Sequence, residues 1–386
     1  MMASCTSSFL PTNKLAASVR APRSPTLRVS ARRQVQVRAD AALIVNTKGG
    51  GHCFLGLYLA KKLIKDGHSV TIMNDGDEAK LSGKAPFNQY PSSGATIVWG
   101  KPEDPSTYPS GDFDIVYDNN GKDMDACKPL IDTYASKVKH YVFVGSAGAY
   151  VANDVEPMHV EGDERKASAG HVAVENYLVE VNAPFTVFQP QYIYGAHTAK
   201  DCEQFFMDRI LRDRPVAIPG SGVQLTSLSN VEDLANMMAL VPGNQAAIGE
   251  HFNMTSDRYV TLDGVAKAIA KAAGKEAKIV HYDPKSAAAK ESGYKFPFRA
   301  VHFFSSVDKA KRVLGWKPEH TFVGDLDERL AEFKASGRLD KDVDFSADDA
   351  VIAEGRNSSA CYNMDGRVGF LSSCGKLKGD CPNVPF

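Results

Sequence analysis

The sequence has no apolar run that approaches the roughly 18 residues of a membrane-spanning helix. Its seven cysteines include no C-x-x-C pair, which speaks against a structural zinc site. Cysteines dispersed in this way are typical of a reducing compartment. With 386 residues and 43% hydrophobic composition, the chain is long enough to bury one large or two medium-sized cores.

Acidic residues are absent from the first 39 positions, which are rich in Arg, Ser, Thr and Ala. This composition is typical of an organelle transit peptide, and we expect removal close to Arg38. A disordered basic arm that binds nucleic acid is the alternative. Loss of residues 1–38 removes seven positive charges from a net charge of −1 and leaves −8. An acidic body of this kind would bind nucleic acid only through a local basic patch.

A βαβ unit opens the body of the chain. The apolar run at 42–45 predicts a buried parallel strand, and a glycine-rich turn follows it. Residues 57–64 then carry a helical apolar stripe, and 70–73 form the next apolar run. A turn of this kind can place backbone N–H groups against a pyrophosphate at a helix N-terminus.

The glycine fingerprint of that turn is incomplete. A G-x-x-G-x-x-G pattern from Gly50 to Gly56 has Cys53 in the middle, where a side chain obstructs the approach of a cofactor. The second strand ends at Asn74, and Asp75 comes one or two positions late for binding a ribose. Binding of NAD(P) is therefore doubtful. The candidate residues of this degenerate dinucleotide turn are Gly50, Gly51 and Gly56.

Strands and helices alternate beyond this unit, which predicts a Rossmann-type, doubly wound parallel sheet. Further strands are expected at 96–99, 113–118, 140–144 and 185–188, and helices at 124–137 and 162–181. A smaller C-terminal α/β lobe follows, with helices expected at 202–212, 231–240, 262–273, 307–314 and 322–336 and a strand at 278–282. We expect four parts: a transit peptide (1–38), a Rossmann-type domain (39–195), a lobe with segments returning to the sheet (196–336), and a poorly ordered tail (337–386).

The order of the motifs resembles the extended short-chain dehydrogenase/reductase superfamily. The matching motifs are Phe54-Leu-Gly56, Gly145-Ser-Ala-Gly-Ala-Tyr150, Gln189-Pro-Gln-Tyr-Ile-Tyr-Gly195, Pro219-Gly-Ser-Gly222, Asn230-Val-Glu-Asp-Leu-Ala235 and Ala310-Lys-Arg-Val-Leu-Gly-Trp-Lys-Pro318. That chemistry uses a Tyr and a Lys one helical turn apart, with a Ser that polarises the substrate. Ser146 is present, but the alignment places Ala167 and His171 at the Tyr and Lys positions, and Tyr177 lies almost three turns further along. Hydride transfer is therefore not expected.

A closer resemblance is to the chloroplast stem-loop-binding proteins, specifically their "a" branch. The motifs that carry it are Asp118-Asn-Asn-Gly-Lys-Asp123, His159-Val-Glu-Gly-Asp163, Ala169-Gly-His-Val172, Lys200-Asp-Cys-Glu203, Asp208-Arg-Ile-Leu-Arg-Asp-Arg214 and Val280-His-Tyr-Asp-Pro-Lys285. The resemblance implies a stromal protein that binds stem-loop mRNA or rRNA and supports plastid RNA stability, rRNA processing and translation. It also implies association with plastid ribosomes or the transcription machinery, an oligomer or a complex with a paralogue, and Mg²⁺-dependent endoribonuclease activity.

Several cations are candidates for contacting RNA phosphates. They are Lys48 and Lys122 on loops at strand ends and a cluster of Lys200, Arg209 and Arg212. Phe296 and Phe298, between Lys295 and Arg299, could stack on unpaired bases. The alternative is that neighbouring aspartates pair the arginines and that the phenylalanines belong to the core.

Candidates for catalysis of RNA cleavage are weaker. His171 is a candidate general base because a histidine titrates near neutral pH, and Asp163 is a candidate acid or metal ligand. Other carboxylates that could serve a metal are Asp118, Asp123 and Glu161. The metal ligands are unknown, and ordinary loop or helix-start roles are the alternative for each residue. Two other functions stay open: an NAD(P)-dependent epimerase or reductase, and a non-catalytic ribosome-associated partner.

Overall fold

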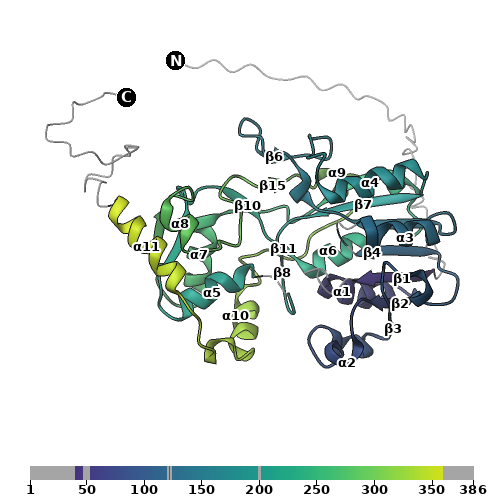
Figure 1. Ribbon diagram of the computed structural model, residues 1–386, viewed down its shortest axis with the longest axis horizontal. Coiled ribbons are helices and arrows are strands. Elements are labelled where there is room, and N and C mark those ends of the chain that lie inside the picture. The colour runs from purple at the N-terminus through teal and green to yellow at the C-terminus, as the bar shows by residue number, and fades with distance from the viewer. Residues whose placement is uncertain (1–39, 47–52, 120, 122–123, 199–200, 360–386) are drawn as a thin grey trace, which may run out of the picture. The chain divides into compact units, whose positions relative to one another are not determined.

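A sheet of seven parallel strands, in the spatial order β12-β7-β5-β4-β1-β2-β3, organises the computed structural model (Figure 1). The structure describes residues 40–46, 53–119, 121, 124–198 and 201–359. The strands are β1 Ala41–Asn46, β2 Ser69–Asn74, β3 Thr96–Trp99, β4 Ile115–Asn119, β5 His140–Val144, β7 Phe185–Pro190 and β12 Glu250–Met254. The order of strands reverses between β1 and β4, where open α/β sheets bind their ligands.

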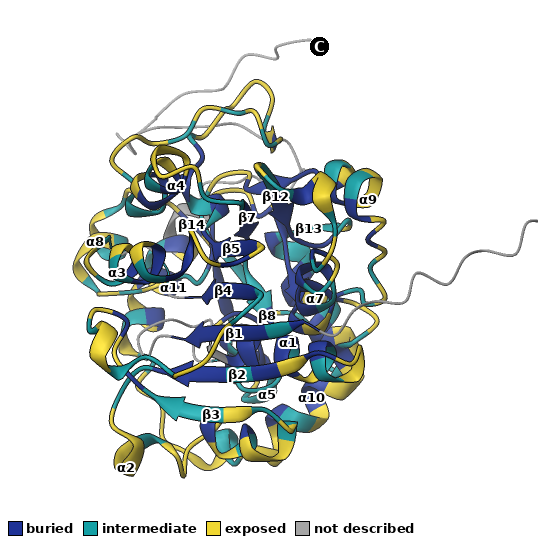
Figure 2. Cartoon of the chain, turned by 90° about the vertical axis from the view of Figure 1, so that its right-hand side faces the viewer, coloured by how far each residue is buried: buried dark blue, intermediate teal, exposed yellow. Residues whose placement is uncertain are grey.

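Helices cover both faces of the sheet. Ala42 and Ile44 of β1 pack with one pair of helices, and Leu43 and Val45 pack with the other pair. The first pair is α1 Cys53–Lys65 and α6 Val231–Met238, and the second is α3 Met124–Tyr134 and α4 Gly170–Glu180. Strands buried on both faces read as continuous apolar runs, and Figure 2 shows β1, β4 and β5 as buried along most of their length. The predicted Rossmann-type fold is confirmed.

A smaller lobe with its own core follows the sheet. Phe205, Phe206, Ile269 and Leu330 join three of its helices in one cluster, and α6, α9 and β12 return from this part of the chain to the sheet. Its helices are α5 Glu203–Leu211, α7 Leu262–Ala272, α8 Ala287–Glu291 and α10 Leu326–Ala335; α9 is Asp308–Leu314, and the short α2 is Glu78–Leu81. None of the helices in the described part of the chain is both long and apolar enough to span a membrane.

Short strand pairs lie outside the large sheet, and two of them, β11 with β8 and β15 with β6, join the lobe to the sheet domain. Parallel pairs are β14 with β9, β11 with β8 and β15 with β6, and β10 pairs with β13 antiparallel. Their bounds are β6 Met158–His159, β8 Ile193–Tyr194, β9 Val216–Pro219, β10 Leu225–Ser227, β11 Ser229–Asn230, β13 Tyr259–Thr261, β14 Ile279–Tyr282 and β15 Phe304–Ser305.

The helix expected at 162–181 begins only at Gly170. Before that point the backbone turns back on the segment after β5: Val151 N–H donates to Glu164 (2.9 Å), and Lys166 N–H donates to Ala149 (2.8 Å). These hydrogen bonds hold residues 164–166 in an extended loop. Ala167 therefore precedes the helix.

The structure differs from the expected tail at 337–386. Helix α11, Ser346–Ser359, packs Val351 and Ile352 against the core of the lobe. A Cβ on Gly355 would lie 2.5 Å from the carbonyl oxygen of His281, so this glycine lets α11 approach β14 closely. The helix was missed because few of its residues are apolar. Residues 1–38 and 360–386 lie outside the described part of the chain.

Candidate ligand site at the sheet edge

Three buried asparagines end neighbouring strands of the sheet: Asn46 on β1, Asn74 on β2 and Asn119 on β4. Asn119 Nδ2 donates to Asn46 Oδ1 (2.8 Å), and Asn46 Nδ2 donates to Asn74 Oδ1 (3.2 Å) and to the hydroxyl of Tyr90 (3.2 Å). This chain of amides crosses the switch point between β1 and β4. The protein's own side chains therefore occupy the strand ends there.

The glycine turn keeps one described feature of a dinucleotide site. A Cβ on Gly56 would lie 2.2 Å from Asn46 Oδ1, so Gly56 provides the close packing of helix on strand expected of a third glycine. Gly50 and Gly51 lie outside the described residues. The second strand ends in the amide of Asn74, where a carboxylate would hold the ribose. Together with the amide chain, this means that the described residues do not fit a dinucleotide.

The proton relay of a dehydrogenase is also missing. Ser146 follows β5, and its Oγ accepts a hydrogen bond from Gly148 N–H (3.0 Å). Ala167 is exposed and has no proton to transfer, and the half-buried His171 lies in the first turn of α4. Tyr177 faces α3, where its hydroxyl contacts Asp132 (2.5 Å). Ser146 is thus present without a phenol at the expected position.

Two other tyrosines near this edge cannot replace the missing phenol. Burial raises the pKa of Tyr192 to about 12, although Arg299 lowers it. Burial also raises the pKa of Tyr150, whose hydroxyl contacts Gln189 Oε1 (2.6 Å) and Asn253 Oδ1 (2.8 Å). A catalytic tyrosine of this chemistry needs a lowered pKa. Both hydroxyl groups are instead engaged in hydrogen bonds within the fold.

A cavity of about 300 Å³ opens between the sheet edge and the lobe. It combines apolar and aromatic walls with a few polar groups, which is typical of ligand sites. The residues that line it are Phe54, Ser146, Gly148, Pro190, Gln191, Tyr192, Ile193, Thr198, Asp201, Cys202, Pro297, Arg299 and Phe303.

Two cations meet beside this cavity. Arg299 Nη2 and Lys166 Nζ both donate to the carbonyl oxygen of Gly148, at 3.0 and 3.2 Å. The Arg299 guanidinium also lies 4.1 Å from the ring centroid of Phe303. Within the described residues, neither cation forms an ion pair with a carboxylate. Two positive charges on one carbonyl oxygen favour an anion nearby.

The charges of both cations reach a buried histidine. Burial lowers the pKa of His159, Asp163 raises it, and the charges of Arg299 and Lys166 lower it further. His159 Nδ1 lies 3.2 Å from Asp163 Oδ2, which also accepts from Val160 N–H (3.1 Å). Asp163 is thus engaged in its own loop.

The other predicted carboxylates also have roles inside the protein. Asp118 is buried and accepts from the hydroxyl of Tyr141 (2.7 Å), and Glu161 accepts from Asn253 N–H (2.9 Å). Asp123 lies outside the described residues. In the described part of the chain, no group of three His, Cys, Asp or Glu residues could hold a metal ion. Any Mg²⁺ bound at the described residues would therefore depend on RNA phosphates and water for most of its ligands.

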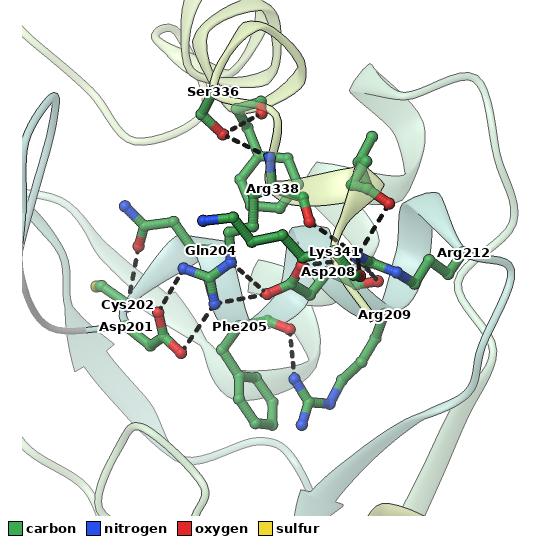
Figure 3. A network of polar contacts seen from close by, with 12 residues as sticks. Asp201, Cys202, Gln204, Phe205, Asp208, Arg209, Arg212, Ser336, Arg338 and Lys341 are labelled. Atoms are coloured by element: carbon green, nitrogen blue, oxygen red, sulfur yellow. Dashed lines mark hydrogen bonds and ion pairs between the residues drawn. The ribbon is translucent and has the colours of Figure 1, made fainter. Parts of the chain in front are cut away.

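The predicted arginine cluster stabilises the lobe. Arg209 is 9% exposed, and its Nη2 lies 2.9 Å from Oδ2 of the buried Asp348. Arg212 binds Asp208 (2.7 Å) and backbone carbonyls of 338–341, and Figure 3 shows Arg338 between Asp201 and Asp208. The arginines meet these internal partners, so they lend no support to phosphate contact. Lys48, Lys122 and Lys200 lie outside the described residues.

The predicted aromatic pair belongs to the core. Phe298 is buried, and Phe296 packs against Phe205 and Phe206 with ring centroids 5.6 and 5.8 Å away. Phe298 is thus enclosed, and the half-buried Phe296 is engaged by aromatic neighbours in the core of the lobe. Here the structure agrees with the alternative that the sequence left open.

Comparison with known proteins identifies the family. The chloroplast stem-loop binding protein of 41 kDa b from Arabidopsis thaliana is 37% identical over 320 residues, which cover 79% of this chain and 83% of the relative. The chain belongs to the chloroplast stem-loop-binding protein family. That relative represents the "b" branch, and membership of the "a" branch stays a prediction. No profile of a protein family matches the chain.

Several solved structures share the fold of this stem-loop-binding family member. One similar structure is Pal from Bacillus thuringiensis (19% identity, TM-score 0.59). Two others are UDP-glucose 4-epimerases, from Thermotoga maritima with UDP-glucose (18% identity, TM-score 0.59) and from Thermus thermophilus with NAD (16% identity, TM-score 0.58). In each case 77% of this chain and 99% of the other chain are covered. At these identities the likeness shows the fold alone.

Sequence reasoning missed the side chains that distinguish the cavity of this family member. Gln191 and Tyr192 lie within a quoted motif, directly after β7 at the carboxyl edge of the sheet. That position was a usable signal, because ligands of parallel sheets bind at this edge. Arg299 was named only as a cation flanking the aromatic pair, and Lys166 gave no local signal. The two residues are far apart in sequence and meet only at Gly148.

Proposed function

We propose that this protein binds stem-loop RNA in the chloroplast, at the sheet-edge cavity of a scaffold that no longer transfers hydride. Membership of the stem-loop-binding family supports the RNA. The observation that carries the choice of site is the pair Arg299 and Lys166, which share one carbonyl oxygen and have no carboxylate partner in the described residues. Phosphate groups would supply the missing negative charge, and guanidinium groups suit them well.

The test is RNA affinity as a function of salt concentration. The protein without residues 1–38 should bind a stem-loop RNA with a Kd that weakens as salt is added. Arg299→Met and Lys166→Met should each reduce the slope of log K against log salt by about 0.7 to 1, because each loses one phosphate contact. Lys290→Met is the matched control, because Lys290 is exposed like Lys166 but lies on α8 and not beside the Gly148 carbonyl oxygen. A slope unchanged by either cavity variant contradicts the proposed site.

The competing function is an NAD(P)-dependent epimerase or reductase. The similar structures that hold NAD or UDP-glucose favour it, whereas Ala167 and the amide chain at Asn46 speak against it. Titration with NAD⁺ and NADP⁺, followed by calorimetry, separates the two functions. We expect no micromolar binding and no turnover; micromolar binding with turnover of a nucleotide sugar would overturn the proposal.

The family resemblance also implies an activity more specific than RNA binding, namely RNA cleavage with a divalent metal ion. The described carboxylates form no group of three that could hold a metal ion, so we propose binding as the function and assign no cleavage step. Incubating a labelled stem-loop RNA with Mg²⁺ or EDTA tests cleavage directly. If cleavage belongs to this site, His171→Ala or Asp163→Ala should abolish it; unchanged cleavage in both variants would identify a contaminant or another site.

Location and assembly complete the proposal. The arginine-rich first 38 residues and the chloroplastic relative support import into the stroma. A fluorescent protein fused behind residues 1–39 should accumulate in the stroma, and cytosolic fluorescence would contradict this. Association with plastid ribosomes, with a role in rRNA processing, predicts co-sedimentation that disappears after RNase treatment.

A further inference from the structure

The cavity is small and has flat walls. A volume of about 300 Å³ is at the lower end of the range for ligand pockets, so it suits one base with its sugar better than an extended dinucleotide. Tyr192 and Phe303 contribute aromatic rings to the lining. The Tyr192 hydroxyl accepts a hydrogen bond from the backbone N–H of Arg299 (2.7 Å), and this bond holds the ring in place. Aromatic walls of this kind stack on unpaired bases.

Gln191 of the lining has no hydrogen-bond partner among the described residues. Its side chain is 5% exposed, and this holds for both its amide nitrogen and its amide oxygen. Buried amides are nearly always paired, so an exception at a cavity indicates a ligand. The amide of glutamine has a donor beside an acceptor, and the edge of a nucleobase has the complementary arrangement.

Positive charge lies next to these groups. Arg299 lines the cavity, and its guanidinium and the ammonium of Lys166 converge on Gly148 beside Ser146. The acidic residue of the lining, Asp201, is neutralised by Arg338 through two hydrogen bonds of 2.8 and 3.0 Å. The cavity therefore combines aromatic walls, one amide and an uncompensated positive edge.

We propose that this cavity receives a single unpaired nucleotide of the RNA. Its base lies against the aromatic lining with its edge read by Gln191, and its phosphate lies beside Arg299 and Lys166. This inference rests on the proposed RNA binding and adds a selective contact to it. The double-stranded stem does not enter the cavity, because reading a base edge here requires a nucleotide that is unstacked from its neighbours.

The test is an abasic scan of the loop of a stem-loop RNA. Replacing one loop nucleotide at a time by an abasic residue should weaken binding by roughly 5- to 150-fold at one position, the cost of losing one bidentate base contact. In Gln191→Leu, an abasic residue at the same position should weaken RNA binding far less, because the amide that reads the base is absent. Gln245→Leu, which changes an exposed glutamine, should behave like the wild type. Circular dichroism confirms that each variant is folded.

The outcomes separate this inference from the proposed function. If the wild type binds no stem-loop RNA, the proposed function fails. If it binds but no loop position matters, or if Gln191→Leu retains the wild-type pattern, RNA binding stands and the nucleotide pocket is refuted. Competition with AMP, CMP, GMP, UMP and UDP-glucose identifies the source of the nucleotide. Binding of a free nucleotide or UDP-glucose that depends on Gln191 but leaves RNA binding unaffected would also refute it.

Discussion

Replacing Asp348 with alanine removes the acidic partner of a buried arginine. Arg209 and Asp348 are 9% and 3% exposed, and the Arg209 guanidinium also donates to the carbonyl oxygen of Phe205 (2.8 Å) and lies 3.4 Å from the ring centroid of Phe205. These contacts hold the guanidinium in the lobe. Without Asp348 its charge stays buried without compensation, which costs about 3–5 kcal/mol of unfolding free energy.

A neighbouring aspartate provides the control. Asp349 on the same helix binds Arg214, but its side chain is 63% exposed, so Asp349→Ala should cost less than about 1 kcal/mol. Both variants are compared by urea unfolding, followed by circular dichroism. The double variant Arg209→Met with Asp348→Leu should lose far less than Asp348→Ala, because both charges disappear together.

Two results would refute this reasoning. Equal stability of Asp348→Ala and Asp349→Ala would mean that the Arg209 pair is not buried in solution. A double variant as unstable as Asp348→Ala would mean that packing of α11, rather than the unpaired charge, sets the cost.

Three further predictions follow from burial. Burial raises the pKa of Glu203 from 4.5 to about 7, so its stabilising contribution is full below pH 4.5 and is lost as pH rises through 7. Glutamine has no charge to bury. The free energy of unfolding of Glu203→Gln, relative to that of the wild type, should therefore rise by up to about 3 kcal/mol between denaturation curves measured at pH 5 and at pH 8. Gly355→Val should loosen α11, seen as faster proteolysis after residue 337, whereas unchanged proteolysis would contradict the close contact with His281. Gln191→Leu should raise the melting temperature while weakening RNA binding, because it removes an unpaired buried amide; a lower melting temperature would contradict this.

The strands of the sheet differ in how far their sequences predict them. Residues 42–45 and 140–144 are predictable because helices cover both faces, so nearly every position is apolar. The strand β12 was missed because His251 and Asn253 alternate with its apolar residues. In the structure His251 Nε2 lies 3.1 Å from Glu175 Oε2, and Asn253 contacts Tyr150. Those partners are remote in sequence, so the local pattern did not indicate a buried strand.

Some features of the candidate site could likewise be predicted from the sequence, and others could not. The lack of a phenol at the expected position could be inferred from Ala167, but the helical spacing assumed between Ala167 and His171 was wrong, because α4 begins only at Gly170. The burial of Arg209 could not be inferred, because its partner Asp348 lies 139 residues away on a helix that the sequence did not predict. Its nearer aspartates, Asp208 and Asp213, suggested only a surface ion pair. The meeting of Lys166 and Arg299 at the cavity likewise requires the folded chain.

Photo-crosslinking tests most directly whether the sheet-edge cavity holds RNA. A stem-loop RNA with a photoreactive base at the position found in the abasic scan is irradiated with the protein, and the modified peptide is identified by mass spectrometry. We predict attachment within residues 185–198 or 297–303, which include Gln191, Tyr192 and Phe303. Attachment confined to other segments, or attachment abolished by equimolar NAD⁺, would contradict the assignment of this cavity to RNA.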